Sequence, residues 1–452
     1  MPDSRHLPVG EPSVTMGAAA IAQAAWPRGR ERLADRAIND TIALVLAGGR
    51  GSRLHELTEH RSKPSLYFGG KYRVVDFALS NCINSGLRRI ALLTQYKSQS
   101  LLSHIQRGWS FTCRGELGEF IELMPAQQQL DEASWYKGTA DAVRQNLELL
   151  RARRPSHVVI LAGDHIYKMD YRRLLEDHVA SGADVTVSCI EVPRAEASQF
   201  GIMSADGAGR IVAFVEKPPD PPAMPDKPDR SLASMGVYVF DAAFLFEHLM
   251  RDAADARSTH DFGKDVIPAL VARARVYAHR FELSSVAQGQ AGCPYWRDVG
   301  TLDAYWAANM DLTDIEPALD LYDRYWPIFT HHEHLPPAKF VHDEEGRRGA
   351  AFNSIVSDGV IVSGGSVRRS VLSSKVRVNS YARLDHTVLL PDVEIGRNAR
   401  LTNVVVDRGC RIPPGLIVGE DPVADRQRFS RSEGGVTLIT QNMLARLGHS
   451  AP

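Results

Sequence analysis

The sequence predicts two domains: a doubly wound, mostly parallel α/β (Rossmann-like) domain over residues 41–328, and a left-handed β-helix within residues 329–452. Short apolar runs alternate with helical stretches from Thr41 to about Ile328, as in a parallel sheet covered by helices. Beyond them, aliphatic residues recur every 17 residues from Ile355 to Val418, which indicates stacked coils. A chain of 452 residues has room for two or three domains. Residues 1–40 are expected to form a flexible N-terminal extension.

The first domain is expected to contain several strands with helices between them. The helices are predicted at Thr139–Arg151 and Tyr171–Ser181, and a loop at Lys217–Ser231 contains six prolines in fifteen residues. That loop is either the rim of a pocket or a plain surface loop. The predicted strands are Ile42–Leu46, Arg89–Leu93, His157–Leu161, Asp184–Cys189, Ile211–Phe214 and Gly236–Phe240. In such sheets, ligands bind at the carboxyl ends of the strands.

The second domain is predicted from three columns of aliphatic residues. A three-sided coil needs one inward aliphatic side chain on each side, with turns between the sides. All twelve positions of the pattern are aliphatic. The columns are Ile361, Val378, Ile395 and Ile412; Val367, Leu384, Leu401 and Val418; and Ile355, Leu372, Leu389 and Val406.

Composition and charge exclude several classes of function. The formal net charge is −1, which argues against a nucleic-acid partner. No apolar run approaches the length of a membrane span, and no signal sequence is evident. The five cysteines have no metal-binding spacing, which fits a reducing compartment without a structural metal. We therefore expect a cytoplasmic protein of the size of an enzyme.

A glycine loop with cations follows the first predicted strand. Gly48, Gly49 and Gly51 let backbone N–H groups approach phosphate oxygens, and Arg53 and Lys63 can neutralise phosphate charge. The loop lacks the third glycine of a dinucleotide fingerprint and the Lys-Ser or Lys-Thr of a Walker A loop. By itself it could equally be a turn without a ligand.

Two carboxylates beside glycines are candidate metal ligands. Asp164 follows the strand that ends near Leu161, and Asp298 lies in a second glycine-containing turn. Carboxylates from distant segments can share one Mg²⁺ with phosphate oxygens. Asp164 is equally well explained as a helix N-cap, and the sequence does not determine whether the two residues meet.

Two further segments carry polar groups that a sugar phosphate could use. Glu216 and Lys217 end a strand together; the lysine could pair with a phosphate and the glutamate with sugar hydroxyls, or the two could form an exposed ion pair. Tyr136 precedes a helix for which Thr139 is a plausible cap, and its ring could belong to the core or to a ligand wall.

Three other features are expected to carry no chemistry. Asp261-Phe262-Gly263 matches a kinase tripeptide, but the other kinase motifs are absent. The histidines at 331, 332 and 334 do not follow the H-E-x-x-H pattern, so a solvated loop is expected there. His386, which is the only histidine in the repeat region, could be an acyl-transfer base but is more often a structural residue.

Long sequence stretches carry a family resemblance. They are LAGGRGSRL, SKPSLYFGGKYRVVDFALSNCINSGLRRI, LLTQYKSQSL, HIQRGW, WYKGTADAV, VVILAGDHIYKMDY, FVEKP, SMGVYVFD, HDFGKDVIP and YWRDVGTLDAYW. Together they resemble the bacterial ADP-glucose pyrophosphorylases (glucose-1-phosphate adenylyltransferases), which belong to the sugar-nucleotide pyrophosphorylases. The resemblance extends from about residue 40 to residue 450 and includes the β-helix.

The resemblance implies a reaction and a set of site residues. The reaction is ATP plus α-glucose 1-phosphate giving ADP-glucose and diphosphate, by metal-assisted in-line attack on the α-phosphate, in glycogen synthesis with Mg²⁺. The implied catalytic residues are Asp164, Arg53 and Lys63, and the implied metal ligands are Asp164 and Asp298. Positions matched to ATP are Gly48, Gly49, Arg53, Gln95 and Gly138, and those matched to glucose 1-phosphate are Tyr136, Gly201, Glu216, Lys217 and Ser234.

The resemblance also implies a homotetramer regulated by small anionic metabolites. Arg61, Tyr67 and Arg73 match an effector-binding cluster between the two domains. His60 and Tyr67 differ from the best-known enteric pattern, and Gln441 and Ala445 stand where that pattern has arginines. The identity of the effector therefore stays open among phosphorylated metabolites.

Three alternatives remain beside this interpretation. The chain could be a non-catalytic regulatory subunit, although Asp164, Lys217 and Asp298 are all present. It could use UTP or dTTP in place of ATP. A bifunctional nucleotidyl- and acyltransferase is less favoured, because the β-helix has fewer than four full periods and one histidine.

Overall fold

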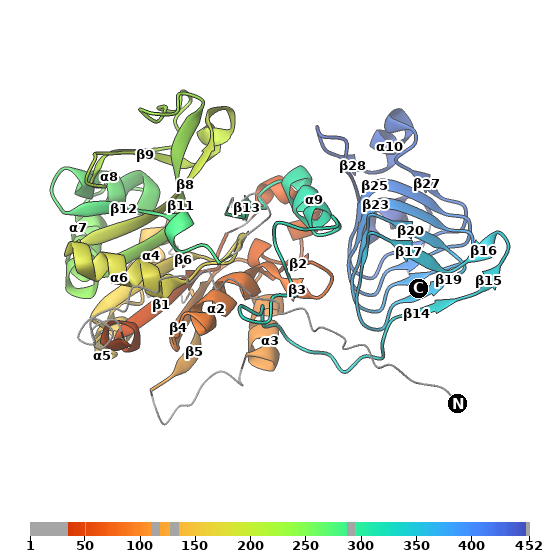
Figure 1. The fold of residues 1–452 in the computed structure, drawn as a ribbon, viewed down its shortest axis with the longest axis horizontal. Coiled ribbons are helices and arrows are strands. Elements are labelled where there is room, and N and C mark those ends of the chain that lie inside the picture. Colours follow the sequence, from red (N-terminus) through yellow and green to blue (C-terminus); the bar gives the residue numbers. More distant parts are fainter. Residues whose placement is uncertain (1–34, 50, 110–117, 127–134, 287–293, 449–452) are drawn as a thin grey trace, which may run out of the picture.

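A computed structural model describes residues 35–49, 51–109, 118–126, 135–286 and 294–448 of the chain. Figure 1 shows an α/β domain and a β-helix side by side, with helix α9 (Leu302–Asp311) between them. Most of the predicted N-terminal extension lies outside the described residues. Its last part, residues 35–39, is helical and leads directly into the first strand.

The α/β domain is built on a nine-stranded mixed sheet in the described part of the chain. Strands β6, β1, β4 and β5 are parallel neighbours in that order. The parallel arrangement was predicted, whereas β5 was not among the predicted strands. The long strand β11 then pairs antiparallel with β6, β8 and β9. The strands are β1 (Thr41–Leu46), β4 (Arg89–Thr94), β5 (Phe120–Pro125), β6 (His157–Ala162), β8 (Val185–Pro193), β9 (Gly201–Ala205), β10 (Ile211–Glu216), β11 (Arg230–Asp241) and β12 (Val276–Arg280).

Helices cover both faces of this sheet, because alternate residues of its buried strands point to opposite sides. Ala43 and Val45 belong to one apolar cluster, and Ile42 and Leu44 belong to the other. Helices α2 (Val74–Asn84), α3 (Gln99–Gly108) and α6 (Tyr171–Ser181) pack in the first cluster. The second contains α4 (Thr139–Arg144), α5 (Leu147–Ala152), α7 (Ala242–Ala254) and α8 (Ile267–Val271).

The helix predicted at Thr139–Arg151 is wrong as a single element, because α4 ends at Arg144 and α5 begins at Leu147. Asn146 lies at the break, and its side-chain amide donates to the carbonyl of Ala142 at 2.8 Å and to the hydroxyl of Tyr136 at 3.0 Å. An asparagine that bonds to nearby backbone competes with the helical hydrogen-bond ladder. Helix α6, in contrast, has the predicted bounds, with Asp170 as its N-cap and Gly182, at φ 59°, as its C-cap.

Two short ribbons flank the main sheet near the carboxyl ends of its strands. β7 (His165–Tyr167) pairs antiparallel with β13 (Trp296–Asp298), which places Asp298 opposite His165. β2 (Tyr67–Phe68) pairs with β3 (Tyr72–Arg73). These ribbons bring residues distant in sequence to the edge at which β1 and β6 end.

The β-helix has three parallel sides, as predicted. One side contains β14 (Lys339–Val341), β19 (Ile361–Ser363), β22 (Arg377–Val378), β24 (Glu394–Ile395) and β26 (Arg411–Ile412). The long strands β23 (Arg383–Leu389) and β25 (Arg400–Val406) contribute to both other sides. The remaining strands there are β17 (Ala350–Phe352), β18 (Ile355–Val356), β20 (Ser366–Arg368), β21 (Val371–Leu372), β27 (Ile417–Val418), β28 (Ser430–Arg431) and β29 (Thr437–Ile439).

The predicted column that starts at Val367 is right throughout, whereas the other two are right from their second member onward and wrong in their first. Val362, and not Ile361, is the register partner of Val378, and Val356, and not Ile355, is the partner of Leu372. The first step is therefore 16 residues. The turn before Val367 contains Gly364 and Gly365, and glycines make a tighter corner possible.

The two domains share an apolar core. Leu302 and Tyr305 of α9 lie in one cluster with Val388, Val405 and Leu438 of the β-helix. The hairpin of β15 (Asp343–Glu344) and β16 (Arg347–Arg348) and the helices α10 (Pro422–Arg428) and α11 (Gln441–Arg446) complete the second domain. No helix in the described ranges is long and apolar enough to span a bilayer. The described cysteines, Cys82, Cys189 and Cys410, are buried free thiols.

Candidate active site

The glycine loop lies at the topological switch point of the sheet. β4 and β6 pair with opposite edges of β1, and ligands of doubly wound sheets bind where the connections diverge in this way. The strand ends are closely packed: a Cβ on Gly48 would lie 3.3 Å from that of Gln95, and a Cβ on Gly163 would lie 2.8 Å from Val45 Cγ1. Nothing lies within 4 Å of a Cβ on Gly49, so a ligand can approach the backbone there.

Asp164 and Asp298 meet beside this loop. The ammonium of Lys63, which lies in the 3₁₀ helix Lys63–Ser65, donates to Asp164 Oδ2 at 2.9 Å and to Asp298 Oδ1 at 2.6 Å. Arg53 adds a second cation, with Nη2 3.8 Å from Asp298 Oδ2. The structure therefore brings together the four residues that the sequence suggested for metal binding and catalysis.

Charge pairing keeps this cluster ionised. Burial by itself would raise the pKa of Asp164, but the Lys63 ammonium and His165 outweigh it and lower that pKa to about 2. Burial would lower the pKa of Lys63, whereas Asp164 and Asp298 raise it above its usual value. A carboxylate that stays charged at neutral pH is available to a metal ion.

The residues present fit a divalent cation. Asp164, His165 and Asp298 each offer a ligand atom, and these atoms lie within 4.8 Å of one another. Within the described ranges, no other group of His, Cys, Asp and Glu meets this criterion. The Nδ1 atom of His165 is buried and has no hydrogen-bond partner. Carboxylate oxygens are the ligands that Mg²⁺ prefers. Sequence reasoning missed His165, although its position next to Asp164 was a signal.

Gly201 and Lys217, two of the residues matched to glucose 1-phosphate, lie next to a third, Glu216. A Cβ on Gly201, or one on Gly263, would lie 2.7 Å from Glu216 Oε2, so both glycines make room for this carboxylate. Lys217 has a left-handed backbone, at φ 47°, and its Nζ lies 3.0 Å from Glu216 Oε1. The Lys217 side chain is 58% exposed, which leaves it accessible to a phosphate.

Ser234 lies at a bulge of β11. The pairing of β11 with β8 shifts register between Ser234 and Tyr238, and Gly236 there has φ 68°. Bulges re-aim side chains beside functional sites. The Ser234 hydroxyl lies 3.4 Å from the hydroxyl of Tyr238.

Tyr136, Gln95 and Gly138 form a second wall. Gln95 Nε2 donates to the Tyr136 carbonyl at 3.3 Å, and the Lys137 N–H donates to Asp141 Oδ2 at 2.9 Å. The Tyr136 phenol contacts Asn146 at the break between α4 and α5. The contacts of Tyr136 therefore connect it to the side matched to the nucleotide, although the sequence resemblance matched it to glucose 1-phosphate.

A separate cavity of about 410 Å³ lies between the two domains. Tyr67 and Arg73 line it, and the Arg73 guanidinium lies 4.6 Å from the centre of the Tyr67 ring. Its other cationic side chains are Lys71, Arg107, Lys375 and Arg408, and its acidic ones are Glu333, Asp358 and Asp392. His331 and His332, which the sequence suggested to be only solvated, also line it.

Arg61 does not line this cavity. Its guanidinium donates to both carboxylate oxygens of Asp407, at 2.8 and 3.3 Å, and both side chains are largely buried. The sequence could not reveal this contact, because Asp407 belongs to the other domain. Arg61 therefore links the α/β domain to the β-helix.

His386 has a structural environment. It occupies a corner of the β-helix with φ 52°. Its carbonyl accepts a hydrogen bond from Trp306 Nε1 at 2.8 Å, which attaches helix α9 to the β-helix. These contacts support the structural role that the sequence suggested for this histidine.

Comparison with known proteins assigns both domains. Residues 42–315 match the family model "Nucleotidyl transferase", and residues 336–439 match "GlmU-like, C-terminal hexapeptide".

Curated relatives cover nearly the whole chain. The glucose-1-phosphate adenylyltransferase of Bradyrhizobium diazoefficiens is 59% identical over 419 residues, 93% of this chain and 99% of the relative. The enzyme of the same name from Mesorhizobium japonicum is 58% identical over 90% of this chain and 97% of the relative. That of Rhodospirillum rubrum is 57% identical over 91% and 97%. The chain therefore belongs to the nucleotidyl transferase family and, within it, to the group of the glucose-1-phosphate adenylyltransferases.

Proposed function

We propose that this protein transfers the adenylyl group of ATP to α-glucose 1-phosphate and releases ADP-glucose and diphosphate, as a step of glycogen synthesis. The observation that supports this function most directly is the Lys63 ammonium between the Asp164 and Asp298 carboxylates, beside the glycine loop. Cations, ionised carboxylates and an open glycine backbone are the groups that bind a polyphosphate with a metal ion.

The chemistry is a displacement at phosphorus. A phosphate oxygen of glucose 1-phosphate attacks the α-phosphorus of ATP, and the bond from this phosphorus to the oxygen that bridges to the β-phosphate breaks. Diphosphate leaves with the electron pair, so the transfer needs no covalent enzyme intermediate. Positioning and neutralisation of charge therefore supply most of the rate.

The nucleotide half of the site would be formed by the glycine loop and its cations. Gly48 and Gly49 would present backbone N–H groups to the phosphates, with Gln95 and Gly138 beside the nucleoside. Arg53 and Lys63 would neutralise the charge on the departing diphosphate. Asp164 and Asp298, with His165 in reach, would hold Mg²⁺, which supplies positive charge to the phosphate oxygens.

The sugar half of the site would be formed at the ends of β10 and β11. The exposed Lys217 ammonium would bind the phosphate of the attacking substrate. Gly201 and Gly263 lack the Cβ atoms that would clash with the Glu216 carboxylate. This carboxylate would accept hydrogen bonds from sugar hydroxyls. Ser234 and Tyr136 complete the proposed set.

Release of diphosphate from different nucleotides tests this function. ATP, UTP, dTTP and GTP are each incubated with glucose 1-phosphate and Mg²⁺, and we expect ATP to be strongly preferred. Preference for UTP or dTTP would make the protein a different sugar nucleotidyltransferase. No release with any of the four would support a non-catalytic regulatory subunit.

We further propose that the cavity between the domains binds small anionic metabolites that regulate the reaction. Its cations, among them Arg73 and Arg408, outnumber its acids, and Tyr67 supplies a hydroxyl. Arg61 would act indirectly, by holding Asp407 next to Arg408. Activity measured with a panel of sugar phosphates and carboxylic acids tests this proposal, and a panel without effect would contradict it.

A homotetramer is the assembly that the family resemblance supports, and sedimentation velocity measures it. The use of ATP as substrate supports a reaction in the cytoplasm.

A further inference from the structure

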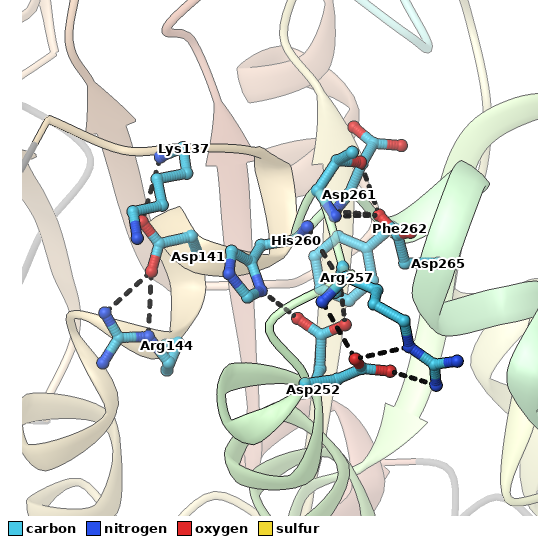
Figure 2. A network of polar contacts seen from close by, with 12 residues as sticks. Lys137, Asp141, Arg144, Asp252, Arg257, His260, Asp261, Phe262 and Asp265 are labelled. Carbon is cyan, nitrogen blue, oxygen red and sulfur yellow. Dashed lines mark hydrogen bonds and ion pairs between the residues drawn. The ribbon is translucent and has the colours of Figure 1, made fainter.

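The chain segment from Ser258 to Gly263, here called the 258–263 segment, lies beside helix α4, and Figure 2 shows its His260 between Asp141 of that helix and Asp252. On the nucleotide side, its His260 carbonyl accepts hydrogen bonds from the N–H groups of Ala140 at 2.8 Å and Asp141 at 3.2 Å. These groups belong to the first turn of α4, whose N-cap residue, Gly138, has no side chain to satisfy them. The segment therefore replaces the missing cap.

The approach to Gly138 is a contact between two backbones. A Cβ at this position would lie 2.3 Å from the His260 carbonyl oxygen and 2.6 Å from that of Thr259. Thr139 strengthens the contact, because its hydroxyl donates to Asp261 Oδ2 at 3.0 Å and accepts from the Phe262 N–H at 3.0 Å. The position of the wall formed by residues 136–138 is thus tied to that of the 258–263 segment.

The same segment contacts the sugar side of the site. Gly263 lies so close to Glu216 that a Cβ would be 2.7 Å from Glu216 Oε2. The Phe262 ring packs against Tyr238, with ring centres 5.9 Å apart, and Tyr238 contacts the Ser234 hydroxyl. One short segment therefore contacts residues of both substrate sides.

A hydrogen bond between two largely buried side chains fixes the conformation of the segment. His260 has φ 58°, a left-handed backbone that a non-glycine residue rarely adopts. Its ring Nδ1 donates to Asp252 Oδ2 at 2.8 Å, and the two side chains are 13% and 12% exposed. Ser258 Oγ donates to Asp252 Oδ1 at 2.6 Å and accepts from the His260 N–H at 2.9 Å. Strained conformations persist where their surroundings hold them in this way.

We propose that Asp252 and His260 are positioning residues of this enzyme, and that the hydrogen bond between them sets the spacing between the nucleotide side and the glucose 1-phosphate side. Neither residue touches the reacting atoms; His260 acts through its carbonyl on α4 and through the segment on Glu216. The inference rests on the proposed function, because the spacing matters only where two substrates must be aligned.

The test compares three variants with the parent. His260→Ala removes the hydrogen bond to Asp252, and we expect the KM values for both ATP and glucose 1-phosphate to rise about tenfold and kcat to fall about tenfold, since misalignment by about 1 Å can cost up to about a hundredfold in rate. His260→Asn keeps a side chain that tolerates the left-handed conformation and can donate to Asp252, so it should recover most of the loss. Arg257→Ala is the matched control, because within the described residues the Arg257 side chain pairs only with exposed Asp255 in the same loop, and its kinetic constants should equal those of the parent.

A readout that does not depend on catalysis completes the test. In His260→Ala, amide hydrogen exchange at Ala140 and Asp141 should become at least about tenfold faster, because the carbonyl that accepts from them is no longer fixed. Unchanged exchange, or a change in the KM of one substrate alone, would overturn the proposal. A parent without diphosphate release would contradict the proposed function instead, and the exchange measurement would still decide the role of the hydrogen bond between His260 and Asp252.

Discussion

Lys63 is the residue on which the electrostatics of the site depend. Its side chain is 6% exposed and it donates to two carboxylates. An unpaired buried ammonium would lose its proton, and two unpaired carboxylates would repel each other. Because the three groups lie together, the two carboxylates stabilise the charged form of Lys63, and the Lys63 ammonium stabilises that of Asp164.

Asp164→Asn should reduce kcat by about 10²–10⁴-fold, because one charge-stabilising group is lost. The variant should remain folded, since asparagine has the same shape and Lys63 keeps its contact with Asp298. Diphosphate release at saturating Mg²⁺, together with far-UV circular dichroism, measures both effects. Near-normal turnover would refute the assignment of Asp164 as a metal ligand.

Lys217→Ala should mainly raise the KM for glucose 1-phosphate, while the KM for ATP stays close to that of the parent. The Lys217 ammonium is exposed and, in the part of the chain that the structure describes, pairs only with the neighbouring Glu216, so removing it would take away the proposed phosphate contact without opening a cavity. Initial rates with each substrate varied in turn measure the two constants. If the KM for glucose 1-phosphate does not change, Lys217 lies outside the phosphate site.

At the scale of elements, the corners of the β-helix repeat a backbone conformation and not a residue type. Left-handed residues recur with the 17-residue period at Lys375, Asp392 and Gly409, and again at Tyr381, Asn398 and Gly415. Each corner needs a positive φ to turn the chain, and a long side chain is accepted where it points into solvent. The repeat in backbone geometry is therefore more regular than the sequence.

Asn398→Ala tests the cost of such a corner. Asn398 is exposed and has φ 58°, and alanine tolerates this conformation less well than asparagine, so the β-helix should lose about 1 kcal/mol of unfolding free energy. Asn398→Gly is the matched control and should be neutral or slightly stabilising. Urea unfolding measures the difference. Equal stability of the alanine and glycine variants would show that the corner is not strained.

Helix α6 gives the α/β domain a pH-dependent contribution to stability. His178 is 2% exposed, and burial, together with the neighbouring His157, lowers its pKa to about 3. The unfolded chain binds this proton near pH 6.5 and the folded chain does not. The unfolding free energy should therefore be unaffected by His178 above pH 6.5 and should fall by about 1.4 kcal/mol per pH unit between about pH 6.5 and 3.

The variant His178→Asn isolates this contribution. Unfolding free energies of parent and variant are measured from pH 7 to pH 4. As the pH falls, the parent should lose stability more steeply than the variant, by up to about 1.4 kcal/mol per pH unit, which corresponds to one additional proton bound by the unfolded parent. Parallel curves would mean that His178 becomes protonated in the folded protein.

At the scale of the whole molecule, the two domains are one packed unit. The outward-facing aliphatic residues Val388, Val405 and Leu438 of the β-helix are buried against α9. Polar contacts extend this interface: Ser430 Oγ donates to Glu56, and Ser432 Oγ donates to Asp303 at 2.5 Å. Such an interface can transmit a change in the cavity between the domains to the loop that carries Lys63.

The Arg61–Asp407 ion pair should be the most costly polar contact of this interface to break. Arg61→Met leaves a buried carboxylate unpaired, so the unfolding free energy should fall by about 3–5 kcal/mol. The double variant Arg61→Met/Asp407→Leu should recover much of it, because an apolar pair replaces the ions. Thermal unfolding of the parent, both single variants and the double variant measures the coupling. Additive single effects would show that the pair does not couple the domains.

Local rules predicted much of the fold. Asp170, Gly182 and the apolar periodicity between them determine α6, because caps and helix period act within a few residues. The same rules failed at Asn146, where a side chain competes with the helix for its own backbone. They also placed Ile355 and Ile361 in columns that Val356 and Val362 occupy. At both positions the two neighbouring residues are aliphatic, so residue type does not reveal that the glycine corner is shortened.

The candidate site could be predicted only in parts. Asp164, Asp298, Lys63 and the glycine loop each stood out by residue type and position, and the family resemblance grouped them. The contact of Arg61 with Asp407 and the role of the Asp261-Phe262-Gly263 stretch could not be inferred, since both depend on residues far away in sequence. Asp261 was set aside as a chance match, yet its carboxylate contacts Thr139.

By itself, the sequence determined the two architectures, the edge of the sheet that binds ligands, and the chemical groups available there, because these follow from periodicity, turn residues and side-chain type. Which of these groups lie in contact with one another follows only from the tertiary packing. The Lys63 ammonium reaches both carboxylates because the β7–β13 ribbon aligns Asp298 with the end of β6. The His260 carbonyl reaches α4 because Gly138 lets two backbones touch. Such contacts depend on the packing of whole elements, which no local sequence pattern encodes.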